Sequence, residues 1–206
     1  MEKPTLKEIL KVYKAKGYKV FEYKDSNGKV VPFNLNIGGI RTNDMTPNTF
    51  NDFEFCFYKD ENEQQKFYLW EITTDPGLYY LRFPLNNKGT AILAPGQYLG
   101  CWQIGLHKGK YKALVQSGDA VKVYRDCNRD DKYDYKEWTA EWGYFGIDNH
   151  RASKYRIVIY VNKFSAGCQV FKDPKDFDEL MALCRYSIKY FPNRFSYTLM
   201  EEKDFC

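Results

Sequence analysis

The chain has 206 residues, of which 44% are hydrophobic and 28% are charged, values that are typical of a folded globular protein. Its 31 Lys and Arg against 27 Asp and Glu leave a formal net charge of +4, spread along the chain, which argues against a nucleic-acid-binding protein. No apolar run approaches the length of roughly 18 residues that a membrane span needs. The first residues lack an apolar segment behind a basic one, so we expect synthesis in the cytoplasm without a signal peptide.

The length suits one domain with an elaborated edge. We divide it into an N-terminal helix and hairpin over residues 1–32 and a main domain over residues 33–206, and we expect one compact unit. The six cysteines include no C-x-x-C pair, which argues against a zinc ribbon or a thioredoxin-type redox centre. The sequence does not indicate an oligomeric state.

An amphipathic helix is predicted near the N-terminus. Thr5 and Glu8 have the spacing of a capping box, in which each side chain binds a free backbone N–H of the first turn. The apolar residues that follow recur at helical spacing, and Gly17 can end the helix. Residues 18–24 and 29–35 are then predicted to be two strands joined by an Asn-Gly turn.

Most of the middle of the chain is predicted to be β-structure. Short segments rich in β-branched and aromatic residues alternate with Gly, Pro, Asn and Asp turn signals. These segments lie around residues 53–57, 67–71, 79–83, 111–116, 121–124 and 156–161. The spacing indicates a mainly β fold, a β-sandwich or barrel-like mixed sheet. One late amphipathic helix capped by Asp173 follows, and an alternating strand over residues 195–199 comes last.

The strongest candidate for chemistry is a histidine followed by a cysteine. His150 lies 18 positions before Cys168, and Gly167 directly precedes the cysteine. An ordinary thiol is mostly protonated at neutral pH, so a nearby imidazole is needed to take its proton and later to protonate a leaving amine. A glycine beside the nucleophile lets the backbone approach the substrate. No histidine follows Cys168, which excludes the papain-like arrangement.

This segment resembles the catalytic motif of the L,D-transpeptidase (YkuD-like) family, which reads His, about fifteen residues, then Ser/Thr-x-Gly-Cys. His150, Ser165, Gly167 and Cys168 match that motif in order and spacing. The surrounding sequences Gly-Ile-x-x-His-Arg and Ser-Ala-Gly-Cys-Gln-Val are similar to a divergent branch found in phage and host-associated bacterial proteins. The resemblance covers about residues 33–200 and implies a mainly β catalytic domain.

The resemblance implies cysteine-dependent acyl transfer on peptidoglycan stem peptides, with no cofactor required. Cys168 would be the nucleophile and His150 the general base, and Ser165 would support the motif. The amides of Gly167 and Cys168 would hold the oxyanion. Arg151 would orient the imidazole through its backbone carbonyl, or contact substrate through its side chain.

The same resemblance leaves the acyl acceptor open. An amine acceptor would give transpeptidation, whereas water would give L,D-carboxypeptidase or endopeptidase cleavage, as in a cell-wall hydrolase or phage lysin. Without a signal peptide, the protein would act at the cell wall after delivery or after release by lysis.

Two departures from the family pattern bear on substrate choice. Ala166 stands two before the cysteine, where a histidine is common, and Val170 stands two after it, where many members have an arginine that contacts substrate. The alternative interpretation is a non-catalytic cell-wall-binding or phage structural module that keeps the fold. In that case Cys168 would be a buried structural thiol and His150 a loop histidine with satisfied hydrogen bonds.

An acidic segment in the middle of the chain has the spacing of a calcium loop. Oxygen-bearing side chains fall at positions 1, 3, 5, 9 and 12 of an EF-hand-like pattern, namely Asp126, Asn128, Asp130, Asp134 and Glu137. Position 6 is Asp131 rather than glycine, and a strand rather than a helix is predicted before the loop. A looser Ca²⁺-binding loop, as in a calcium-stabilised adhesive domain, and a solvated acidic turn are the two interpretations.

The remaining histidine, His107, lies in a stretch flanked by glycines. It either lines the substrate groove or is an exposed loop histidine.

Overall fold

The computed structural model describes residues 2–205, and it confirms the mainly β prediction. Within these residues eight strands close into a barrel in the order β1-β11-β5-β6-β9-β10-β3-β2, and a smaller sheet has the order β4-β7-β8. The barrel strands are β1 (Asn36–Arg41), β2 (Asp52–Lys59), β3 (Gln65–Thr73), β5 (Gly96–His107), β6 (Tyr111–Gln116), β9 (Asn149–Arg151), β10 (Gln169–Phe171) and β11 (Phe195–Glu201). The smaller sheet consists of β4 (Thr90–Leu93), β7 (Val121–Asp126) and β8 (Glu141–Gly143).

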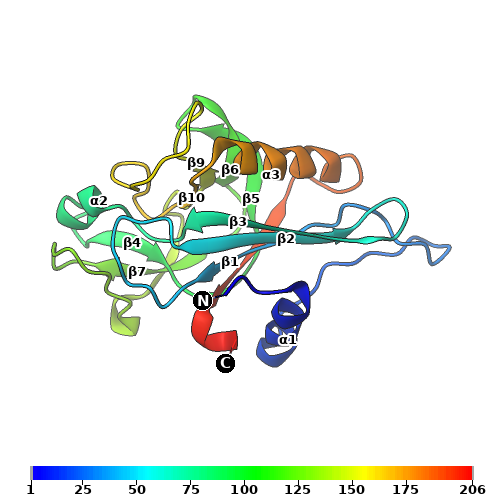
Figure 1. The fold of residues 1–206 in the computed structure, drawn as a ribbon, viewed down its shortest axis with the longest axis horizontal. Coiled ribbons are helices and arrows are strands. Elements are labelled where there is room, and N and C mark those ends of the chain that lie inside the picture. Colours follow the sequence, from blue (N-terminus) through cyan, green and yellow to red (C-terminus); the bar gives the residue numbers. More distant parts are fainter. Residues whose placement is uncertain (1, 206) are drawn as a thin grey trace.

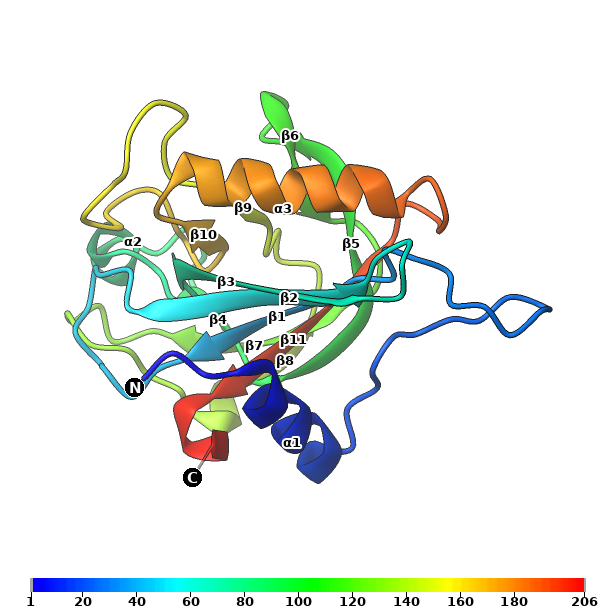
Figure 2. The ribbon, with the colours of Figure 1, turned by 45° about the vertical axis from the view of Figure 1, so that its right-hand side comes forward.

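Two longer helices lie on opposite sides of the barrel, α1 (Leu6–Lys16) and α3 (Pro174–Ser187), as Figures 1 and 2 show. Both begin as predicted, because Thr5 and Glu8 form the capping box of α1 and the Asp173 side chain accepts the Lys175 N–H at the start of α3. Gly17 ends α1 in the left-handed conformation with φ 69°.

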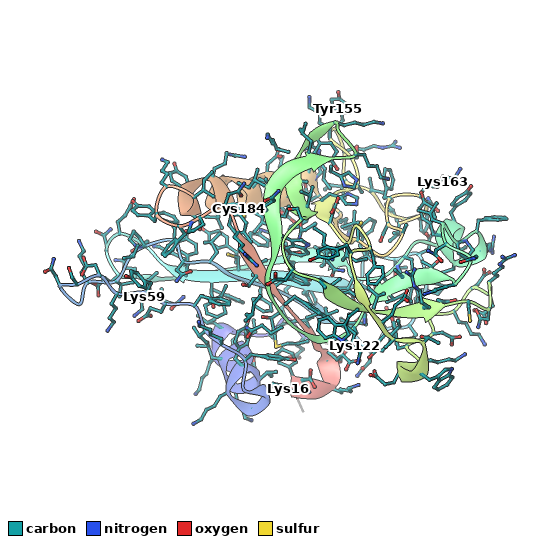
Figure 3. All side chains as sticks on the ribbon, turned by 180° about the vertical axis from the view of Figure 1, so that it is seen from behind. Lys16, Lys59, Lys122, Tyr155, Lys163 and Cys184 are labelled. Atoms are coloured by element: carbon teal, nitrogen blue, oxygen red, sulfur yellow. The ribbon has the colours of Figure 1, made fainter. Side chains whose placement is uncertain are left out.

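Helix α1 belongs to the same compact body as the barrel. Its apolar side packs with barrel residues into one buried cluster, which contains Ile9, Val12, Tyr13, Ile40, Phe55, Phe57 and Met200. Helix α3 joins the main core from the other side, and Figure 3 shows Cys184 on the side of the helix that faces the barrel. None of the helices within residues 2–205 has the length and apolarity that crossing a bilayer requires.

Four predicted strands are wrong, each because tertiary context outweighs β propensity. Residues 79–83 form most of the short helix α2 (Leu78–Arg82), whose Leu81 is buried against Ile92 and Tyr133. Residues 18–24 and 29–35 make a single bridge, Lys24 to Val30, and the turn between them projects from the barrel (Figure 1). Their remaining residues pack or hydrogen-bond against the barrel instead of pairing with each other, as Phe33 and Leu35 in the core show.

The fourth wrong strand, residues 156–161, lies in the long loop between β9 and β10. Val158 and Val161 anchor this loop by packing against Phe50 and Val170, while the residues between them are exposed. Tyr155 lies at the outer end of the loop, away from the body of the protein (Figure 3). Strand β10 therefore begins only after the loop has returned to the barrel at Gln169.

Candidate active site

Strands β9 and β10 bring the predicted histidine and cysteine to neighbouring positions. The two strands pair in parallel, with Asn149 opposite Gln169 and His150 opposite Val170. Cys168 directly precedes β10, so it lies at the start of the strand that runs beside His150. The sequence separation of the pair is thus spanned by one loop between two adjacent strands.

The side chains of Asn149 and Gln169 point into the barrel. Asn149 donates to both carboxylate oxygens of Glu54 on β2, at 2.7 and 2.6 Å, and Tyr197 on β11 donates to Gln169 at 3.0 Å. Each contact joins strands that are not neighbours in the barrel, so it must cross the interior. Because side chains alternate along a strand, the residues next to Asn149 and Gln169 face outward, and these are His150 and Cys168.

His150 and Cys168 both line one cavity of about 480 Å³ on the outer side of the barrel. The cavity is also lined by His107 at the end of β5, by Asp148 directly before β9, and by Ala91 of β4. A concave site that gathers a thiol, two imidazoles and a carboxylate is the arrangement expected of an active site.

His150 is buried and held in one tautomer. Its Nδ1 lies 3.0 Å from the backbone carbonyl oxygen of Arg151, and since a carbonyl only accepts, Nδ1 carries the proton. Tyr111 donates its hydroxyl to the same carbonyl at 3.2 Å. Burial and the neighbouring His107 lower the pKa of His150 to about 3, so the ring is neutral and its Nε2 has a free lone pair.

Cys168 carries a protonated thiol. Its Sγ donates to the carbonyl of Gly146 at 3.3 Å, and burial together with the negative charge of Asp148 raises the pKa of the thiol to about 12. The resting pair is therefore a neutral thiol and a neutral imidazole rather than a thiolate and an imidazolium. Nucleophilic attack from this state needs the thiol to leave Gly146 and pass its proton to a base.

Ser165 and Gly167 shape the turn that carries the thiol. Ser165 is fully buried, donates its hydroxyl to the Cys168 carbonyl at 2.9 Å and accepts the Gly167 N–H at 3.1 Å. Gly167 has φ 115°, and a Cβ on it would lie 2.1 Å from the carbonyl oxygen of Ala91. Glycine is required there because the backbone of β4 passes directly against the turn. The Gly167 amide predicted to bind an oxyanion is engaged by Ser165 in this state.

Arg151 contributes its backbone near His150, while its side chain points elsewhere. The guanidinium lies over the Tyr111 ring at 4.2 Å and pairs with Asp178 of α3 at 3.5 Å. It borders a separate depression with Ser153, Lys154 and Tyr155, and it is not among the residues that line the cavity. The structure thus separates the two roles predicted for Arg151 and places only the carbonyl beside the imidazole.

His107 is a buried part of the cavity, with 6% of its surface exposed, so its interpretation as an exposed loop histidine is wrong. Its Nδ1 lies 2.7 Å from Oδ2 of Asp148, and its ring stacks on His150 with centroids 4.1 Å apart. The other oxygen of Asp148 accepts the Gln116 N–H at 2.9 Å. A carboxylate, a first imidazole and a second imidazole are therefore in contact in that order, in the cavity that Cys168 also lines.

Sequence reasoning missed Asp148, Tyr111 and Lys108, which the structure adds to the surroundings of His150 and Cys168. A signal for Asp148 was present, because it precedes His150 by two positions and alternate residues of a strand share a face. Tyr111 and Lys108 come from the hairpin of β5 and β6, and no local pattern connects them with His150.

Most side chains of the acidic loop have protein partners, while Oδ1 of Asp126 is buried without a hydrogen-bond partner among the described residues. Asn128 donates to both Asp130 and Asp134 at 3.0 Å, and Lys136 pairs with Asp134. Asp126 accepts the Asp134 N–H at 3.1 Å, and Glu137 pairs with Lys122. Within residues 2–205, no group of three or more His, Cys, Asp or Glu side chains is arranged to hold a metal ion.

In comparisons with known proteins, no family model, no curated protein and no solved structure matches this chain.

Proposed function

We propose that the protein is a cysteine acyltransferase of the L,D-transpeptidase type that acts on peptidoglycan stem peptides. The observation that carries the proposal is the shared cavity of Cys168 and the neutral, oriented imidazole of His150. The resemblance of His150, Ser165, Gly167 and Cys168 to the family motif supplies the substrate class. No cofactor enters the proposed reaction.

The first half of the proposed reaction forms a thioester. The Cys168 thiol turns from the Gly146 carbonyl toward the cavity and gives its proton to Nε2 of His150 as sulfur attacks the acyl carbon. The carbon–nitrogen bond of the tetrahedral intermediate then breaks, and the leaving amine takes the proton from His150. The Cys168 amide is the donor that we assign to the oxyanion, since Ser165 engages the amide of Gly167.

The second half resolves the thioester. An amine of another stem peptide, or water, attacks the acyl carbon while His150 accepts its proton, and the proton returns to the departing sulfur. The amine gives a cross-link and water gives a cleaved stem peptide. Either acceptor would enter the cavity of about 480 Å³, which has Phe164 and Leu85 among its lining residues.

A second candidate, a non-catalytic cell-wall-binding module, is favoured by one observation. The hydrogen bond of the Cys168 thiol goes to Gly146 and not to His150, and the thiol pKa is raised. A structural thiol has the same properties. The two candidates differ in whether Cys168 is needed for a change in covalent bonds.

The deciding experiment is mass analysis of muropeptides after the purified protein has been incubated with isolated sacculi. The wild-type protein is compared with Cys168→Ala and with Cys127→Ala, which changes an exposed cysteine as the matched control. We expect new or lost stem-peptide bonds with the wild type and with Cys127→Ala, and none with Cys168→Ala. The mass change distinguishes water from an amine as the acceptor.

Two results would contradict the proposal. One is an unchanged muropeptide profile with the wild-type protein across sacculi of several chemotypes, provided that circular dichroism shows it folded. The other is a changed profile that persists in Cys168→Ala. Retention of the folded wild-type protein on sacculi without any change in bonds would support the binding module.

A further inference from the structure

Two segments of the chain carry positive charge without a compensating carboxylate. None of the 27 Asp and Glu residues falls within residues 103–118 or 149–172, although these segments contain eight of the 31 Lys and Arg residues. The first segment includes the turn between β5 and β6, and the second includes the long loop between β9 and β10. Because the two segments are separated in the sequence, only the fold can bring their charges together.

The turn and the long loop meet at one end of the molecule. They share a depression of about 330 Å³, separate from the cavity of Cys168, whose lining includes Lys110, Tyr111, Arg151, Lys154 and Tyr155. None of the described residues that line this depression is acidic. Arg151 pairs with the exposed Asp178 at 3.5 Å, and Lys110 and Lys154 are themselves exposed. Figure 3 shows Tyr155 at this end of the molecule, beside the hairpin of β5 and β6.

The same loop presents large apolar side chains to solvent. Four of them are more than half exposed, namely Tyr155, Ile157, Ile159 and Tyr160. The loop itself is fastened to the body of the protein, because the N–H groups of Ala152, Val158 and Val161 donate to backbone carbonyls of Phe171, Lys172 and Asn48 at 3.0, 3.1 and 3.0 Å. Apolar side chains that gather in the open on one well-held element mark a surface for a partner.

Carboxylates mark the edge of this surface. Ile157 also borders a second depression, whose lining includes Glu71, Asp173 and Asp176. Glu71 pairs with Lys172 at 2.6 Å, and Asp173 caps α3. The uncompensated positive charge therefore lies on the turn and at the tip of the loop, and it does not extend to the start of α3.

A membrane surface with anionic lipids matches both properties of this end of the molecule. Negative headgroups attract Lys and Arg side chains, and Tyr and Ile side chains are stabilised at the boundary between headgroups and acyl chains. A soluble polyanion would use the cations but leave the apolar side chains in water. A purely apolar partner would leave the cations unused.

We propose that the β5–β6 turn and the loop between β9 and β10 dock on an anionic phospholipid membrane. Lys110, Arg151 and Lys154 would hold a lipid phosphate in the depression, and the exposed apolar side chains of the loop would enter the interface. The inference goes beyond the proposed function, because membrane docking needs neither Cys168 nor His150.

The test is flotation of the 206-residue protein with lipid vesicles. One set of vesicles contains phosphatidylcholine with about 30% phosphatidylglycerol, and the other contains phosphatidylcholine alone. We expect at least about 100-fold tighter binding to the anionic vesicles, because each of three cations near the surface contributes roughly 5-fold. Binding should weaken as the salt concentration rises.

Two double variants separate the charged from the apolar contribution. Lys110→Gln with Lys154→Gln should weaken binding to the anionic vesicles by about 25-fold. Tyr155→Ser with Ile159→Ser keeps the charge and should weaken binding by about 10-fold, because less apolar surface enters the interface. All four side chains are exposed, so both variants should fold, and circular dichroism checks that they do.

Each double variant has a matched control on another face. Lys11→Gln with Lys14→Gln removes two exposed cations from α1, on the opposite side of the barrel from α3. Leu99→Ser changes a half-exposed apolar side chain near the other end of β5. Both controls should bind the anionic vesicles as the wild type does.

Several results would overturn the inference. One is a folded wild-type protein that does not bind the anionic vesicles, and another is equal weakening by the α1 control pair. Soluble glycerol phosphate, added at the concentration of the phosphatidylglycerol, separates a membrane from a soluble phosphate-bearing polymer. Displacement by it, with binding unchanged in Tyr155→Ser with Ile159→Ser, would replace the membrane by such a polymer. Cys168→Ala should bind vesicles as the wild type does, so failure of the proposed enzyme activity would not alter this result.

Discussion

His107 lies nearly parallel to His150, with ring centroids 4.1 Å apart and planes inclined by 23°. His107 holds Asp148 through Nδ1, and the charge of Asp148 acts on both His150 and Cys168. The carboxylate of Asp148 thus influences the pKa of the Cys168 thiol and of the His150 imidazole through its charge. His107, which lies between Asp148 and His150, holds that carboxylate in place. This arrangement gives the site a means of setting when Cys168 loses its proton.

The first prediction concerns this carboxylate. Asp148→Asn removes a negative charge that raises the pKa of Cys168, so the pH profile of Cys168 alkylation should shift to lower pH. His107→Phe keeps a flat ring beside His150 but leaves the Asp148 carboxylate without its partner, so the profile should shift to higher pH. The measurement is the iodoacetamide rate against pH, resolved by peptide mass spectrometry because Cys127 is also exposed.

Opposite shifts separate this electrostatic role from a purely structural one. Loosening of the cavity would speed alkylation of Cys168 in both variants, whatever the sign of the charge change. Asp119→Asn, on the turn between β6 and β7, is the control that should leave the profile unchanged. Shifts of the same sign in the two variants would refute the prediction.

The second prediction concerns Gly167. Alanine there would be strained by φ 115° and would bring its Cβ to 2.1 Å from the Ala91 carbonyl. We expect Gly167→Ala to lower the free energy of unfolding by at least about 2 kcal/mol. Gly28→Ala, with φ 79° and open space around it, should cost only about 1 kcal/mol. Urea denaturation of both variants checks the difference, and equal losses would show that Ala91 can move aside.

Much of the framework could be predicted because its signals are local. The caps of α1 and α3 depend on residues within one helical turn, and Thr5, Glu8 and Asp173 are found where the sequence places them. The closure of the barrel could not be predicted, since it requires β1 to pair with β11 across almost the whole chain. Helix α2 replaced a predicted strand because burial of Leu81 decided its conformation.

The candidate site also contains residues that the sequence could reveal and residues that it could not. The order and spacing of His150 and Cys168 could be recognised in the sequence, and parallel pairing of β9 with β10 explains how a long loop keeps them together. His107 and Lys108 enter from the hairpin of β5 and β6, so their contribution depends on strand order. Such long-range neighbours become visible only in three dimensions.

The third prediction concerns the acidic loop. Asn128 and Lys136 already contact Asp134, Arg82 pairs with Asp131 at 2.6 Å, and Lys122 pairs with Glu137. We therefore expect the melting temperature to be the same in millimolar calcium and in EDTA, because a ligand that binds the native state must raise stability. Thermal denaturation followed by circular dichroism is the measurement. A calcium-dependent rise that disappears in Asp134→Asn would instead establish the looser calcium loop.

The last prediction concerns Glu54, which lies fully buried inside the barrel with Asn149 as its hydrogen-bond partner. Burial raises the pKa of Glu54 well above its ordinary value. The unfolded chain releases this proton near pH 4.3, about the value for an exposed glutamate, whereas the folded protein keeps it to higher pH. The contribution of Glu54 to stability is therefore fully present below that pH and is lost as pH rises through the folded pKa.

Glu54→Gln removes the titrating group while keeping the shape of the side chain. Asn149 can turn its amide to accept from the new glutamine, since its Oδ1 has no partner within the described residues. The free energy of unfolding should fall less steeply from about pH 5 to about pH 8 in the variant than in the wild type. Glu63→Gln, at an exposed position, should reproduce the wild-type slope. Parallel curves for wild type and Glu54→Gln would mean that Glu54 is ionised in the folded barrel, with its charge compensated beyond Asn149.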